Sequence, residues 1–136
     1  INKPLIIHTR DAQDDTLSLL KNGHADKSGG VLHCFTESLD MAKKAIDDLD
    51  FYISISGIAS FRNAEQLRAT IKALPLEKLL IETDSPWLAP VPHRGKENQP
   101  AYVIDVAKCV ADVKGITLEE VAKTTTANYY KLFNNA

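Results

Sequence analysis

Four short apolar, β-branched runs alternate with amphipathic segments, and this alternation constrains the fold of the chain more than any other feature. The apolar runs, each of which suits a buried strand, span residues 3–7, 31–35, 51–57 and 78–82. Helical spacing of apolar side chains is found in the intervening segments 11–23, 38–49 and 63–74. Strands that alternate with helices predict βα units and a parallel sheet, so the expected fold class is α/β.

The segment after the fourth apolar run breaks the alternation. Residues 85–100 are rich in proline and cannot form regular structure. Helices are expected to return at 102–114 and after the capping box at 117–120, with a separate final helix around residues 130–133. We treat residues 1–136 as a single domain.

Chain length leaves two architectures open. A complete eightfold β/α barrel takes about 250 residues. The 136 residues of this chain therefore hold about half a barrel or all of a small open sheet. Because the chain begins with Ile1, almost inside a strand, we expect it to be a piece of something longer.

Composition excludes several classes of protein. The 44% hydrophobic and 25% charged fractions are those of a globular protein, and no apolar run approaches the roughly 20 residues of a membrane span. A net charge of −2 excludes a polycation that coats nucleic acid, so a nucleic-acid partner would need local contacts. Two widely separated cysteines give no disulfide framework and favour a cytoplasmic location, with no membrane partner.

Polar side chains follow three of the four apolar runs. His8 follows the first run, His33 lies late in the second, and Asp84 follows the fourth, two residues beyond Glu82. The carboxyl ends of parallel strands meet at one rim, where α/β proteins place their working groups. Two imidazoles and one carboxylate there can form a metal site with a position open for water, although a single histidine at a strand end is more often only hydrogen-bonded.

Five short motifs occur here in a family-specific order. They are PLIIHTR at 4–10, LHCF at 32–35, YISISG at 52–57, ETDSP at 82–86 and PHRGKENQP at 92–100. Together they cover essentially the whole chain, which resembles the carboxyl-terminal half of the TatD family of metal-dependent deoxyribonucleases. That resemblance implies strands five to eight of a TIM (β/α)8 barrel of the metallo-dependent hydrolase type.

The resemblance also implies roles for individual residues. His8 and His33 would bind one divalent ion, and Asp84 would bind a second ion and act as the catalytic residue at the attacking water. Two ions are expected, and nitrogen and oxygen ligands admit Mg, Mn or Zn. The family's His-x-His pair and bridging glutamate are absent from this sequence. We therefore expect the chain alone to be inactive, and to require the missing amino-terminal half or self-association.

The implied activity is hydrolysis of DNA phosphodiester bonds, most simply as a 3′-to-5′ exonuclease. Two other interpretations stay open: an amidohydrolase-like metal enzyme acting on small amides or esters, and an inactive half barrel that acts only by assembling with a partner. Candidate substrate contacts are Arg10, Arg62, Arg94 and Asn98. Glu82 is two residues from Asp84, so on a strand both side chains point to the same side. Glu82 can therefore hydrogen-bond to a metal ligand and orient it, or form an unrelated ion pair.

Two further residues near the expected rim have alternative interpretations. Trp87 can stack on a base or serve as an apolar plug beneath the proline-rich loop, and no specific contact is assigned to it. Cys34, next to His33 along the chain, is expected to face the opposite side and pack against the helix layer.

Overall fold

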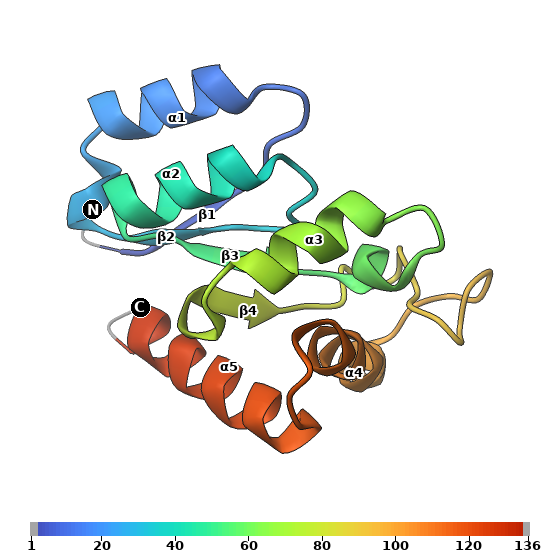
Figure 1. Ribbon diagram of the computed structural model, residues 1–136. Helices are drawn as coiled ribbons and strands as arrows, with labels where there is room; N and C mark the ends of the chain where they lie inside the picture. The colour runs from blue at the N-terminus through green and yellow to red at the C-terminus, as the bar shows by residue number, and fades with distance from the viewer. Residues whose placement is uncertain (1–2, 135–136) are drawn as a thin grey trace.

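The computed structural model describes residues 3–134, and these form one four-stranded parallel sheet with helices around it (Figure 1). The strands are β1 (Leu5–Ile7), β2 (Gly30–Leu32), β3 (Tyr52–Ile55) and β4 (Leu79–Ile81). They are paired in the order β1-β2-β3-β4, and every pairing is parallel. The expected α/β architecture with successive βα units is confirmed.

Five α-helices accompany the sheet. They are α1 (Gln13–Asn22), α2 (Leu39–Leu49), α3 (Glu65–Ala73), α4 (Val103–Lys114) and α5 (Leu118–Phe133). Helices α1, α2 and α3 cover one face of the sheet, whereas α4 and α5 lie beyond β4 (Figure 1). The expectation of a separate final helix is wrong, because no glycine or proline interrupts residues 118–133 and α5 is continuous.

Side-chain caps fix the start of two of these helices. The hydroxyl of Ser38 accepts a hydrogen bond from the backbone N–H of Met41 at the start of α2. Thr117 does the same for the N–H of Glu120 at the start of α5, as the capping box predicts. None of the helices within residues 3–134 is long and apolar enough to cross a membrane.

Alternate residues of each strand face opposite sides of the sheet, and one side forms the main core. Leu32, Ile53, Ile55 and Leu79 are fully buried there, in a cluster that includes apolar residues of all five helices. Burial of such side chains stabilises the fold by about 1.5–3 kcal/mol each. The sheet is therefore stabilised mainly by packing of the helices against this face.

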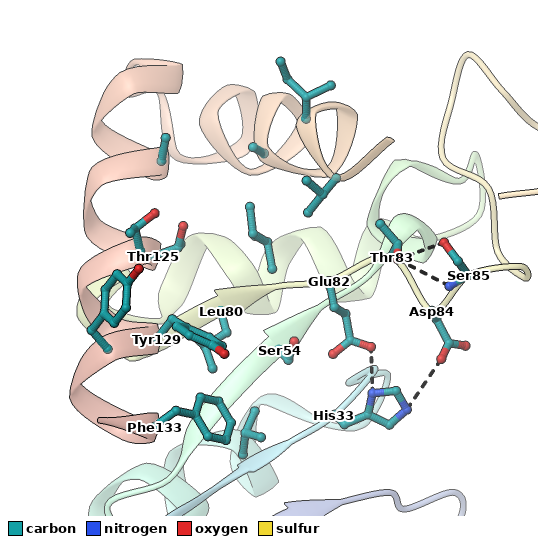
Figure 2. Close-up of a pocket in the computed structure, with 18 of the residues that line it drawn as sticks. His33, Ser54, Leu80, Glu82, Thr83, Asp84, Ser85, Thr125, Tyr129 and Phe133 are labelled. Carbon is teal, nitrogen blue, oxygen red and sulfur yellow. Dashed lines mark hydrogen bonds and ion pairs between the residues drawn. The ribbon is translucent and has the colours of Figure 1, made fainter. Parts of the chain in front are cut away.

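The opposite side of the sheet is concave and partly open. Register places Ile6 beside Val31, and Ser54 beside Leu80, on this face. Together with α4 and α5 it encloses a cavity of about 980 Å³, part of which is drawn in Figure 2. Near the amino-terminal ends of the strands, Val31, Tyr52 and Leu80 form a second apolar cluster, against which Leu132 and Phe133 of α5 pack. In a closed barrel this face would be the interior.

Candidate metal centre

The candidate site lies where the strands end. His8 follows the last residue of β1 directly, His33 follows β2, and Glu82 follows β4, with Asp84 two positions further. Since the strands are parallel, their carboxyl ends lie along one edge of the sheet, and the side chains of His33, Glu82 and Asp84 point toward one another there (Figure 2).

His33 lies between two carboxylates. Its Nδ1 is 2.7 Å from Oε1 of Glu82, and its Nε2 is 3.7 Å from Oδ1 of Asp84. All three side chains are partly buried, and one ligand atom from each lies within 4.8 Å of the others. Among the described residues this is the one group of three or more such side chains close enough to hold a metal ion.

The two distances indicate different roles for the two carboxylates. Ligand atoms about 2.1 Å from a tetrahedral ion lie about 3.4 Å from one another. The 3.7 Å between His33 Nε2 and Asp84 Oδ1 is close to that separation, so both atoms can bind one ion. The 2.7 Å between Nδ1 and Glu82 is too short for two ligands of one ion and has the length of an N–H···O contact.

The donor set at Nε2 of His33 suits a divalent cation. An imidazole nitrogen and a carboxylate oxygen are ligands that Zn and Mn accept, and both side chains are partly buried. Glu82 Oε1 is buried behind the ring, and its close polar neighbour is His33 Nδ1. The residues present therefore fit a divalent ion.

His8 lies next to this group without being part of it. Its ring centroid is 5.6 Å from that of His33, the two rings are inclined by 47°, and His8 is exposed. The structure thus places His8 at the same rim, and its role as a metal ligand stays a prediction.

An unusual backbone conformation follows two of the strands. Asp84 and Cys34 have φ values of 58° and 48°, which side chains other than glycine seldom adopt. Backbone hydrogen bonds secure both segments, from Trp87 N–H to the Asp84 carbonyl and from Phe35 N–H to the Ser54 carbonyl. Strained conformations held in this way are concentrated at functional sites.

The interpretation of Cys34 as a residue of the helix layer is wrong. Its positive φ interrupts the alternation of the strand, and its thiol donates instead to Ser56 Oγ over 3.3 Å. Burial raises the pKa of the Cys34 thiol; the hydrogen bond with Ser56 opposes this rise, and the negative charges of Glu82 and Asp84 raise the pKa further. Cys34 therefore belongs to the surroundings of the site.

Asn98 is engaged inside the protein, and its expected contact with substrate stays a prediction. Its side chain is 3% exposed, and Nδ2 donates to the backbone carbonyls of Thr83 and Trp87, each over 2.7 Å. Its Oδ1 accepts from the N–H of Gln99. With these groups engaged, Asn98 braces the loop that follows β4. Sequence reasoning missed this role because all these partners are backbone groups.

The three arginines expected to contact substrate are exposed. Arg10 lies in the loop after β1, and Arg62 lies between β3 and α3. The guanidinium of Arg94 stacks 3.7 Å from the ring centroid of Phe61, which links the loop after β4 to the loop after β3. Within residues 3–134 none of the three forms an ion pair, so their charges are available, and their contacts with substrate stay predictions.

The structure is a half barrel whose strands carry, at their carboxyl rim, a cluster of side chains close enough to hold a metal ion. The chain belongs to the family of TatD-related DNases, whose family model matches residues 1–134. The resemblance inferred from the five motifs is confirmed.

Individual relatives agree with this assignment. The uncharacterized metal-dependent hydrolase YcfH of Escherichia coli (strain K12) is 59% identical over 134 residues, which are 98% of this chain and 50% of that protein. YabD of Bacillus subtilis, also named an uncharacterized metal-dependent hydrolase, is 44% identical over 133 residues, or 98% and 52%. The chain thus spans about half the length of these curated relatives.

Solved structures show the same fold. The TatD homologue YJJV from Escherichia coli K12 superimposes with a TM-score of 0.88 at 30% identity, covering 98% of this chain and 51% of that one. A TatD family hydrolase from Entamoeba histolytica gives a TM-score of 0.84 at 21% identity, over 98% and 51%, and shows the shared fold. The half-barrel interpretation of the fold is confirmed, and the small open sheet is excluded.

Proposed function

We propose that this chain supplies the carboxyl-terminal half of a metal-dependent deoxyribonuclease that removes nucleotides from the 3′ end of DNA. The single observation that carries the proposal is the group formed by His33, Glu82 and Asp84, with 3.7 Å between His33 Nε2 and Asp84 Oδ1. Membership of the TatD-related DNase family supports the phosphodiester as the bond that is cleaved.

The residues of this site divide the chemical work. When bound, a divalent cation lowers the pKa of water and neutralises charge on the phosphoryl oxygens. The carboxylate of Asp84 accepts a proton from the attacking water or holds that water in line with the phosphorus. Glu82 faces Nδ1 of His33 and so fixes the ring with Nε2 toward Asp84.

Charge at the rim favours a phosphate substrate over a small neutral amide. Arg10, Arg62 and Arg94 are exposed and form no ion pairs within residues 3–134. Guanidinium groups match phosphate oxygens in geometry and charge. This observation supports DNA as the substrate and weighs against the amidohydrolase-like alternative.

We further propose that activity belongs to a completed barrel, in which an amino-terminal half closes the concave face of residues 1–136. Three observations support this: the chain covers half the length of its relatives, the outer strands β1 and β4 are each paired on one side only within residues 3–134, and the cavity of about 980 Å³ is half open. Self-association of the chain is the alternative arrangement. Both cysteines of the chain are free, which supports a reducing compartment, and we propose the cytoplasm.

The test is a nuclease assay on the completed barrel. Single-stranded DNA labelled at its 5′ end is incubated with Mg, Mn or Zn, and we expect successive shortening from the 3′ end that chelation abolishes. His33→Ala and Asp84→Ala should each reduce the rate about 100-fold or more, since each removes a ligand or the proton acceptor. Absence of metal-dependent cleavage, or an unchanged rate in both variants, would overturn the proposal; release from the 5′ end would overturn the direction.

A further inference from the structure

Trp87 is placed beside the candidate metal centre with its indole in solvent. The side chain is 71% exposed, although tryptophan is normally well buried. Its backbone N–H donates to the carbonyl of Asp84 over 3.0 Å, so a tight turn joins the two residues. The Cα atoms at the two ends of such a turn lie within about 7 Å. The interpretation of Trp87 as an apolar plug is therefore wrong.

Buried hydrogen bonds fix the backbone that carries the indole. The amide of Asn98 bridges the carbonyls of Thr83 and Trp87, and the backbone N–H of Asn98 donates to the carbonyl of Pro86 over 2.9 Å. The turn is thus tied from both sides to one buried residue. These hydrogen bonds hold the loop without any contribution from the indole, so packing of the loop does not explain why Trp87 is exposed.

A close backbone approach holds the next residue in a costly conformation. Leu88 has a φ of 57°, which is uncommon for a leucine. Its carbonyl oxygen lies so near Gly57 that a Cβ atom at that glycine would come within 2.2 Å of it. Glycine at position 57 therefore permits the loop after β4 to dock on the turn after β3, and this contact fixes the direction of the chain after Trp87.

We propose that Trp87 is a stacking platform for the unpaired base next to the phosphodiester that is cleaved. This inference rests on the proposed nuclease function and adds the residue that contacts the base. A fixed aromatic face stacks on any of the four bases, because every base has a π-face. Bases within a duplex are already stacked and paired. The indole of Trp87 can therefore stack only on a base at a frayed or single-stranded end.

Charges around the loop favour a nucleic acid over a protein as the occupant. Arg94 lies on the same loop as Trp87 and stacks over Phe61 of the loop after β3, and its guanidinium forms no ion pair within residues 3–134. A nucleotide can stack its base on the apolar face of the indole and place its phosphate near the positive charge of Arg94. An apolar protein surface would leave that charge unmatched.

The first test uses Trp87 as its own reporter, because it is the only tryptophan in the chain. The 136-residue chain is titrated in EDTA with a 12-nucleotide single strand, and with the same strand carrying an abasic 3′ terminus. We expect saturable quenching by the first and at least about 5-fold weaker binding of the second. Equal affinities, or no quenching, would overturn the inference. So would emission that iodide fails to quench before DNA is added, which would indicate that protein covers the indole.

The second test separates this inference from the proposed function. In the completed barrel, Trp87→Ala should raise KM for single-stranded DNA about 5- to 150-fold with a smaller change in kcat, and Trp87→Phe should restore most of the loss. Cleavage with an unchanged KM in Trp87→Ala overturns the stacking role and leaves the nuclease function intact. Quenching that depends on the terminal base, without any metal-dependent cleavage, supports the stacking role and overturns the nuclease function.

Discussion

The imidazole of His33 and the carboxylate of Glu82 meet at 2.7 Å, closer than two ligands of one metal ion would lie. The contact occupies the Nδ1 side of the ring and leaves Nε2 directed at Asp84. Carboxylates placed behind a ligating histidine set its tautomer and raise its basicity. We therefore predict that Glu82 acts on a bound metal ion through His33, whereas Asp84 binds the ion directly.

This division of roles predicts different outcomes for two conservative variants. Glu82→Gln should weaken metal affinity by about 10- to 100-fold, because the amide can still accept a hydrogen bond but loses its charge. Asp84→Asn should weaken binding more and also remove the proton acceptor, with a loss of activity of at least about 100-fold. Isothermal titration with Mn or Zn measures the first quantity, and single-turnover cleavage measures the second.

Asp105 provides the matched control for these carboxylate variants. It lies on α4, and its Oδ2 is 3.1 Å from Nε2 of His93 in the loop after β4. Asp105→Asn should leave metal affinity unchanged. If Glu82→Gln and Asp84→Asn had equal effects on affinity, the two carboxylates would share one role and the assignment would fail.

The hydrogen bonds of Asn98 should contribute measurably to the stability of the protein. Asn98→Ala leaves two carbonyls, those of Thr83 and Trp87, without their donor, at a cost of about 1–3 kcal/mol in the free energy of unfolding. The neighbouring Gln99 is exposed, so Gln99→Ala should change stability by less than about 0.5 kcal/mol. Urea denaturation of both variants checks the difference. Equal stabilities would show that the bridge is dispensable.

The site residues that sequence reasoning could find are those that directly follow strands. Alternation locates the strand ends, and parallel pairing brings them to one rim, so His33 and Asp84 are predictable from the pattern alone. Glu82 shares their face through its parity with Asp84. Here local periodicity and tertiary position agree, and the prediction needs no knowledge of individual contacts.

Prediction fails where the backbone leaves the regular pattern or where partners are distant along the chain. Alternation places Cys34 on the wrong side because its φ is positive, a conformation that the residue type does not indicate. Asn98 looks like any polar loop residue until its bridge to two carbonyls is seen. The close approach of Leu88 to Gly57 likewise depends on how two loops pack.

The concave face predicts that association depends on apolar side chains that are exposed in the isolated chain. Ile6 is 66% exposed on β1, and Leu19 is 72% exposed on α1. Ile6→Lys should weaken binding of a separately expressed amino-terminal half at least about 10-fold, because it places a charge in the barrel interior. Leu19→Lys, on the helix layer, should not. Pull-down and sedimentation of the paired halves measure this, and equal binding by both variants would contradict barrel closure.

Lys114 joins α4 to the end of α3 and predicts a pH dependence of stability. Its Nζ donates to the carbonyls of Ile71 and Leu74 over 3.0 and 2.6 Å, which satisfies acceptors left free at the helix end. Burial lowers the pKa of Lys114, and the charge of Glu77 opposes that shift only in part. Lys114→Met should cost about 1–3 kcal/mol at neutral pH, because the carbonyls lose their donor.

The sign of the pH effect follows from proton binding in the two states. Between the lowered pKa of the folded state and the ordinary pKa of the unfolded state, the unfolded chain binds more protons at Lys114. This residue therefore makes the free energy of unfolding rise with pH across that alkaline window.

The measurement compares the pH profiles of stability of the wild type and of Lys114→Met. Subtracting the second profile from the first isolates the rise due to Lys114 from that of other titrating groups. Lys108→Met, at an exposed ion pair with Asp105, is the control and should parallel the wild type. A flat difference between the wild-type and Lys114→Met profiles would mean that Lys114 is not desolvated as its three carbonyl contacts imply.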